Sequence, residues 1–148
     1  MLSMVFGTAL LYIAIDDICN LRVRNWANAL VAALGALDAF WQDRLLDAAS
    51  GAVLGFALVY GVAALYRRWR GRDGMGMGDV KLMAAGGMWL GPLDVPMALL
   101  MACASALLAV IAFSVFGHAS FADGKIPFAP FLAFGIFAAW MATGLGWI

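Results

Sequence analysis

Two aspartates, Asp17 and Asp79, carry the side chains of this sequence with the clearest capacity for chemistry. Asp79 ends the glycine-spaced stretch 74–79 and precedes an apolar segment, whereas Asp17 follows the first apolar stretch. Carboxylates at the edge of a membrane are costly and are therefore functional candidates. Two converging carboxyl groups cannot both ionise easily, so one keeps its proton and the pair can serve as general base and general acid on a water. The pattern indicates peptide hydrolysis that needs no metal and no cofactor.

Purely structural roles would also explain these residues, and the sequence pattern alone does not exclude them. An aspartate directly before an apolar helix occupies a favoured N-cap position, which would explain Asp79. Gly74, Gly76 and Gly78 suit a flexible loop, and Asp17 suits the solvated end of a helix. The pairing of two such carboxylates on one expected side of a membrane favours chemistry.

The composition predicts a membrane protein. Of the 148 residues, 66% are hydrophobic and only 12% are charged, whereas soluble domains have about 25% charged residues. A chain this short cannot bury so much apolar surface in one core. The zero net charge gives no indication of nucleic acid, and no basic region precedes the first apolar run as in a removable signal peptide. Cys19 and Cys103 are too far apart in sequence to indicate a zinc site or a disulfide framework.

Six apolar stretches organise the chain, at 2–15, 26–41, 46–66, 80–93, 95–116 and 126–148. Backbone polar groups must be satisfied inside lipid, so each spanning stretch is expected to be helical. We therefore predict an all-α integral membrane protein, a polytopic bundle of about six transmembrane helices in one domain covering residues 1–148. The first, second and fourth stretches are shorter than the roughly 20 residues that a span needs.

The basic residues predict the orientation of this bundle. Eight Lys and Arg residues fall in or beside the loops around 18–25, 67–79 and 117–125, whereas the other side holds only Arg44. Cytoplasmic loops are enriched in Lys and Arg. We expect a multi-pass protein of the bacterial inner membrane, with both termini non-cytoplasmic and with Asp17 and Asp79 at the cytoplasmic side. Gly51 with Gly55, and Gly87 with Gly91, form GxxxG patterns that predict close helix packing.

The glycine-spaced stretch 74–82, followed by 84–87 and 90–91, resembles the GxGD motif of the type IV prepilin peptidases, which are membrane aspartic peptidases. Asp17 stands eight positions before Asn25, as the first aspartate of that family stands before the last residue of an Ile-Pro-Asn-like triplet. Asp16 would point about 100° away on a helix, so the spacing favours Asp17. The segment 126–132, with Pro127 and Pro130, resembles a third family motif.

The chain departs from the family pattern at two positions and over one region. Arg24 replaces the usual proline of the triplet, and Ala129 replaces a glycine. The paired-cysteine zinc motif and the N-methyltransferase region of longer members are not found in this sequence. The resemblance therefore implies a short form with the peptidase core alone.

The resemblance implies an aspartic endopeptidase that cleaves the leader of type IV prepilins or pseudopilins, for a type IV pilus or type II secretion, at the cytoplasmic membrane face. Asp17 and Asp79 would activate water and protonate the leaving amine. Lys81 lies on another helix face than Asp79 and is interpreted as a loop anchor or a phosphate contact. The expected supporting residues are Gly76, Gly78, Lys81, Asn25, Pro127 and Pro130. The expected partners are the prepilin or pseudopilin substrate and the lipid bilayer. Assembly into a homo-oligomer is left as an alternative.

Other functions remain alternatives. The acids could relay protons in a small proton-coupled transporter, or the chain could be a catalytically silent scaffold of a pilus or secretion machine. Within the GxGD enzymes, a peptidase of the signal-peptide-peptidase type is a further alternative. His118 lacks partners at metal-ligand spacing, so it is expected in a solvated loop, and Asp38 is expected where the second span ends.

Overall fold

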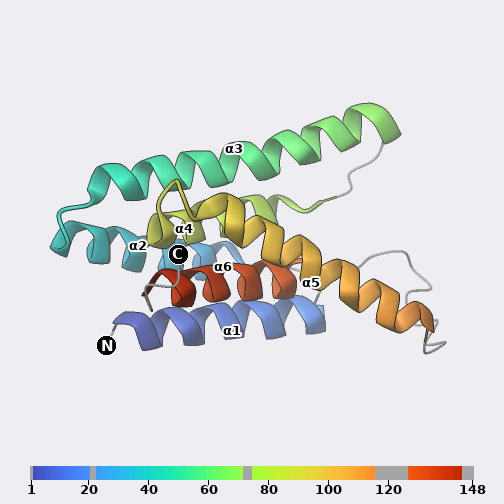
Figure 1. Cartoon of the computed structure of the whole chain (residues 1–148), viewed down its shortest axis with the longest axis horizontal. Helices are drawn as coiled ribbons and strands as arrows, with labels where there is room; N and C mark the ends of the chain where they lie inside the picture. The colour runs from blue at the N-terminus through green and yellow to red at the C-terminus, as the bar shows by residue number, and fades with distance from the viewer. Residues whose placement is uncertain (1, 21–22, 72–74, 116–126, 145–148) are drawn as a thin grey trace.

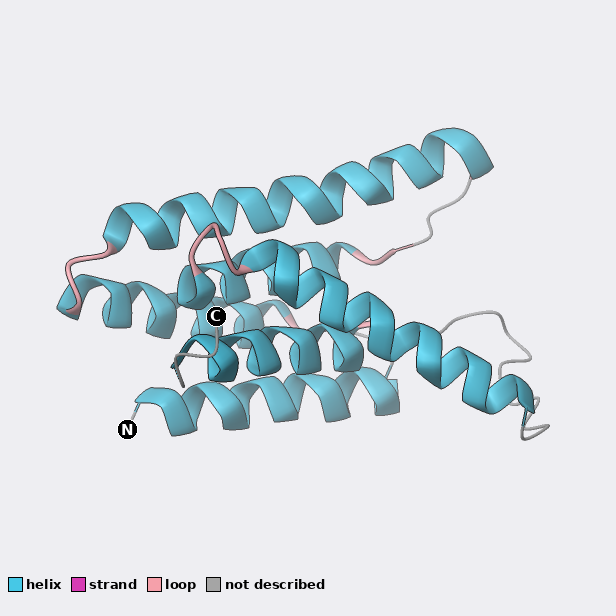
Figure 2. Ribbon diagram, viewed as in Figure 1, coloured by secondary structure: helices cyan, strands magenta, loops and turns pink. Residues whose placement is uncertain are grey.

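The computed structural model describes residues 2–20, 23–71, 75–115 and 127–144, and within these residues it contains six α-helices and no strand (Figures 1 and 2). Helix α1 covers Leu2–Asn20, α2 covers Asn25–Trp41 and α3 covers Leu45–Arg70. Helix α4 covers Met77–Leu90, α5 covers Val95–Val115 and α6 covers Ala129–Gly144. The all-α fold predicted from the sequence is confirmed. The predictions for Gly74, His118 and three of the basic residues, Arg22, Arg72 and Lys125, lie outside the described residues.

Helix α4 is the most enclosed helix of the bundle, because it packs against α2, α3 and α6. Figure 1 shows α3 and α1 along opposite edges, with the other helices between them. Two aromatic side chains connect α4 to its neighbours. The ring of Phe6 on α1 stacks on that of Trp89 on α4 with centroids 4.1 Å apart. The Trp89 indole Nε1–H donates to the Val31 carbonyl oxygen of α2 over 3.0 Å.

Small residues bring α3 and α4 into backbone contact. A Cβ added at Gly51 of α3 would meet the Gly87 carbonyl oxygen of α4, and one at Gly55 would lie 2.7 Å from the Met83 carbonyl oxygen. The predicted close packing through these glycines is confirmed. Gly91 has a second role, because it ends α4 with a φ of 77°, a backbone conformation that glycine adopts at little cost.

A charged cluster holds the connection between α2 and α3. The Arg44 guanidinium donates to the Trp89 carbonyl oxygen near the end of α4 over 3.2 Å, and lies 2.7 Å from a carboxylate oxygen of Asp38. The same Asp38 oxygen accepts a hydrogen bond of 2.6 Å from the Gln42 amide. Asp38 is therefore paired within a loop anchor near the end of α2, where the sequence suggested that the span ends.

Among the residues that the structure describes, two helices are long and apolar enough to cross a membrane, namely α3 and the part of α5 covering Val95–Ala112. In the 18-residue apolar stretch of α3 only 22% is buried, and in that of α5 only 17% is buried. Both helices therefore expose apolar surface instead of forming a soluble core. Large apolar side chains elsewhere are also exposed, such as Leu46 at 87% and Leu93 at 89%. Such surface suits contact with lipid. The count of six spans and the side of each terminus stay predictions.

The contact between α3 and α4 predicts different effects for two Gly→Ala changes on α3. Gly51→Ala should lower the free energy of unfolding by roughly 1–3 kcal/mol, because its methyl group meets the α4 backbone. Gly61→Ala is the matched control: no atom lies within 4 Å of its added Cβ, so it should be neutral or stabilising by up to about 1 kcal/mol. The check is the thermal midpoint of each purified variant in detergent, and equal midpoints would contradict the packing.

Candidate active site

Asp17 lies near the end of α1 and contacts the start of α6. Its side chain is only 6% exposed, and its Oδ2 atom accepts a hydrogen bond of 3.2 Å from the Ala129 backbone N–H. Ala129 is the first residue of α6, where backbone N–H groups have no partner within the helix. Pro127 precedes this helix and Pro130 lies in its first turn, a position where a missing N–H costs little. The third sequence motif therefore positions Asp17 through the backbone.

Asp16 has different partners from Asp17. One of its carboxylate oxygens lies 3.1 Å from the Nε atom of Arg24, and the other accepts a hydrogen bond of 2.7 Å from the Asn20 side chain. Arg24 is the extended residue directly before α2. Asp16 therefore holds the connection between α1 and α2, and the predicted difference between Asp16 and Asp17 appears as two separate sets of partners. The ion pair between Asp16 and Arg24 was missed in the sequence, although the charged residue in place of a proline was a signal for it.

Asp79 lies in the first turn of α4 and is 8% exposed. The N-cap residue of α4 is Gly76, and the Asp79 N–H donates to the Gly76 carbonyl oxygen over 3.1 Å. Asp79 is therefore not the N-cap residue itself, because α4 begins at Met77, earlier than the apolar stretch. Asp79 instead projects from a helix start where unpaired N–H groups favour a negative charge.

Gly76 and Gly78 have different surroundings. Gly76 is exposed, and the nearest atom to a Cβ added there is Asp79 Oδ2 at 3.7 Å. At Gly78 the Cβ would lie only 2.8 Å from the Cβ of Val23, which precedes α2. A Cβ at Gly76 would thus make an ordinary contact with the Asp79 carboxyl group, whereas Gly78 allows the segment before α2 to approach α4.

Asparagines of α2 hold the start of α4 from the other side. The Lys81 ammonium donates to the Asn25 side-chain oxygen over 3.0 Å, which agrees with the interpretation of Lys81 as a loop anchor. The Asn28 amide donates to the Gly78 carbonyl oxygen over 3.1 Å. Asn28 was missed in the sequence; the available signal was a polar residue one turn inside the second apolar stretch.

The two candidate carboxyl groups are electrostatically linked. Asp17 and Asp79 lie outside the two membrane-length helices, α3 and α5. They also lie outside the apolar stretches 2–15 and 80–93. Burial raises the pKa of Asp79 to about 6, with a further rise from the charge of Asp17 and a partial offset from a hydrogen bond with the Gly76 backbone. Burial also raises the pKa of Asp17, opposed by the Ala129 N–H and assisted by the charge of Asp16. Burial and the charge of Asp17 therefore both favour the protonated form of Asp79.

The arrangement suits general acid and base chemistry on a water, because one carboxyl group of such a pair is ionised while the other is protonated. Among the described residues, no three or more His, Cys, Asp or Glu side chains gather in a group that could hold a metal ion.

Comparisons with known proteins show which family the chain is similar to. Residues 4–113 match the type IV leader peptidase family. A prepilin leader peptidase/N-methyltransferase of Burkholderia pseudomallei is 35% identical over 91 residues, 62% of this chain and 29% of that protein. One of the same name from Aeromonas hydrophila is 32% identical over 118 residues, 79% of this chain and 37% of that protein.

A further relative is the type 4 prepilin-like proteins leader peptide-processing enzyme of Escherichia coli, which is 35% identical over 104 residues, 67% of this chain and 36% of that protein. The chain thus spans about a third of the length of these relatives. No solved structure is significantly similar to it. Pro127 and Pro130 lie beyond the residues that match the family, so the contact from Ala129 to Asp17 is evidence from the fold alone.

The coupling predicts that Asp17→Asn lowers the pKa of Asp79 from about 6 towards, but not down to, the ordinary aspartate value. The like charge disappears, whereas burial, the larger cause, remains. The measurement is an infrared titration of the protonated carboxyl band, assigned by its loss in Asp79→Asn. Asp16→Asn is the control and should leave the Asp79 titration in place. An unchanged Asp79 titration in Asp17→Asn would show that the two groups are not coupled.

Proposed function

The chain belongs to the type IV leader peptidase family, and from this premise we propose that it is an aspartic endopeptidase that cleaves the leader of type IV prepilins or pseudopilins. One observation carries the proposal: two carboxyl groups on separate helices, Asp17 and Asp79, are both buried, and the charge of Asp17 raises the pKa of Asp79. The printed names of the relatives support the choice of substrate class.

In the proposed mechanism the ionised carboxylate of the pair accepts a proton from a water. The water oxygen forms a bond to the carbonyl carbon of the scissile peptide. The protonated carboxyl group then donates its proton to the nitrogen as the carbon–nitrogen bond breaks, which releases the new amine. The Ala129 N–H orients Asp17 for this step. The exposed Gly76 beside Asp79 leaves room for an extended substrate backbone.

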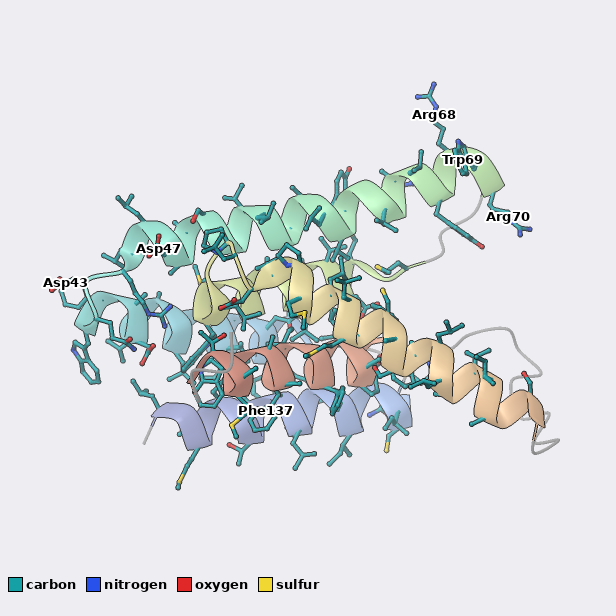
Figure 3. The ribbon with its side chains drawn as sticks, viewed as in Figure 1. Asp43, Asp47, Arg68, Trp69, Arg70 and Phe137 are labelled. Atoms are coloured by element: carbon teal, nitrogen blue, oxygen red, sulfur yellow. The ribbon has the colours of Figure 1, made fainter. Side chains whose placement is uncertain are left out.

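We further propose that residues 1–148 form one multi-pass domain of the bacterial inner membrane, with the site at its cytoplasmic face. The distribution of charge along α3 supports this orientation. Figure 3 shows Arg68 and Arg70 at one end of the helix and Asp43 and Asp47 at or beside the other end. The end of α1, with Asp17, and the start of α4, with Asp79, lie toward the basic end (Figure 1). Basic residues mark the cytoplasmic side of membrane proteins.

The transporter alternative receives less support from the position of the acids. Proton relays place ionisable groups inside the bundle along the transport path. Here Asp17 lies one turn from the end of α1 and Asp79 lies in the first turn of α4. Both positions suit a substrate that arrives at one membrane surface.

The proposed reaction predicts that Asp17→Asn and Asp79→Asn each reduce cleavage of a full-length prepilin in membranes by at least about 10²-fold, because each removes one acid–base group. Asp16→Asn is the matched control. It retains an oxygen for the Asn20 side chain and loses only the ion pair with the exposed Arg24, so it should keep most of the activity. The measurement is the rate of leader removal at matched expression. Equal processing by all three variants and the parent would favour the transporter or scaffold alternatives.

A further inference from the structure

A groove with apolar walls lies between α2, α3 and α4, on the side of α4 that faces away from Asp79. Its volume is about 310 Å³. Lys81, Ala84 and Met88 of α4 line it at helical spacing, whereas Asp79 stands two positions before Lys81 and therefore roughly 200° around the helix. The remaining walls are mainly small side chains of α2 and α3 with the Phe56 ring, including Ala29, Ala32 and Ala52. The groove is thus separate from the carboxyl pair.

The polar groups of the groove gather at one end. Lys81 lies one turn into α4, while Asn25 and Asn28 lie in the first turn of α2. Among the described residues, the exposed Lys81 ammonium uses one of its three donors, on Asn25. Asn28 is 4% exposed, and its side-chain oxygen is buried without a hydrogen-bond partner within the described part of the chain. The groove therefore offers a cation at one end and hydrocarbon walls beyond, while the buried Asn28 oxygen is not accessible from it.

The walls and the length of the groove suit an acyl chain. From Lys81 to Met88 the groove follows α4 for about 10 Å at 1.5 Å per residue. Half of the residues that line it are alanines, and its charged group lies at one end.

We propose that this groove binds an anionic glycerophospholipid, with one acyl chain along the alanine walls and the phosphate against the Lys81 ammonium. The polar end of the groove is directed toward the basic end of α3, where Figure 3 shows Arg68 and Arg70. Phospholipids present their phosphates at the membrane surface, and basic pockets between helices on the cytoplasmic side attract anionic headgroups. The site is separate from peptide cleavage, so lipid binding is expected whether or not the chain is a peptidase.

The test is native mass spectrometry of the full chain, extracted in detergent and incubated with phosphatidylglycerol or with phosphatidylcholine. We expect one tightly held phosphatidylglycerol per chain and weaker retention of phosphatidylcholine. Lys81→Gln should weaken phosphatidylglycerol binding about fivefold, the attraction of one basic residue to an anionic membrane lipid, and Lys81→Arg should restore it. Lys81 is exposed, so these changes leave the packed core intact.

A second pair of variants tests the walls. Ala52→Phe fills the groove and should abolish the tightly held lipid, whereas Ala57→Phe, exposed on α3 and absent from the groove lining, is the matched control and should retain it. Equal retention in the parent, Lys81→Gln and Ala52→Phe would mean that the lipid is non-specific and would overturn the proposal. So would equal binding of both lipids, or a dimer that Ala52→Phe dissociates, since a second copy would then occupy the groove.

Discussion

Glycine backbones bring α3 and α4 closer together than side chains would allow, and this contact encloses α4. Gly51 faces the Gly87 carbonyl oxygen, and Gly55 faces that of Met83. With α3 so close, α4 is covered by α2 and α6 on its other faces. The first turn of α4 is thereby held at the edge of the bundle with Asp79 buried at its start. The position of this carboxyl group therefore depends on residues that have no side chain at all.

The second carboxyl group depends on the start of another helix. Asp17 accepts the Ala129 N–H of α6, and α6 also packs against α4, where Ile136 fills the space beside Gly86. Helix α6 thus connects the two helices that carry the aspartates. The charge of Asp16, one residue before Asp17, is balanced by Arg24. Two adjacent aspartates consequently have different surroundings, one in the connection between helices and one in the candidate site.

Helix α4 separates two kinds of surface. One side carries the buried Asp79 and packs toward α6, and the other carries Lys81, Ala84 and Met88 along the apolar groove. A helix can serve both because residues two positions apart point in different directions. The proposed peptide cleavage and the proposed lipid contact therefore use opposite sides of α4, near the same end of the bundle.

The sequence alone determined the helical fold, the apolar surface and the identity of Asp17 and Asp79 as candidates, because periodicity, composition and motif spacing are local properties of the chain. It also predicted the glycine contacts of α3, since small residues at helical spacing indicate close packing. Only the tertiary structure decided that α4 starts at Met77, that Asp16 pairs with Arg24 and that Asn28 holds the Gly78 carbonyl oxygen. It alone showed the Ala129 N–H on Asp17, across 112 positions of sequence. Such contacts join segments that are distant in the chain, so no local pattern specifies them.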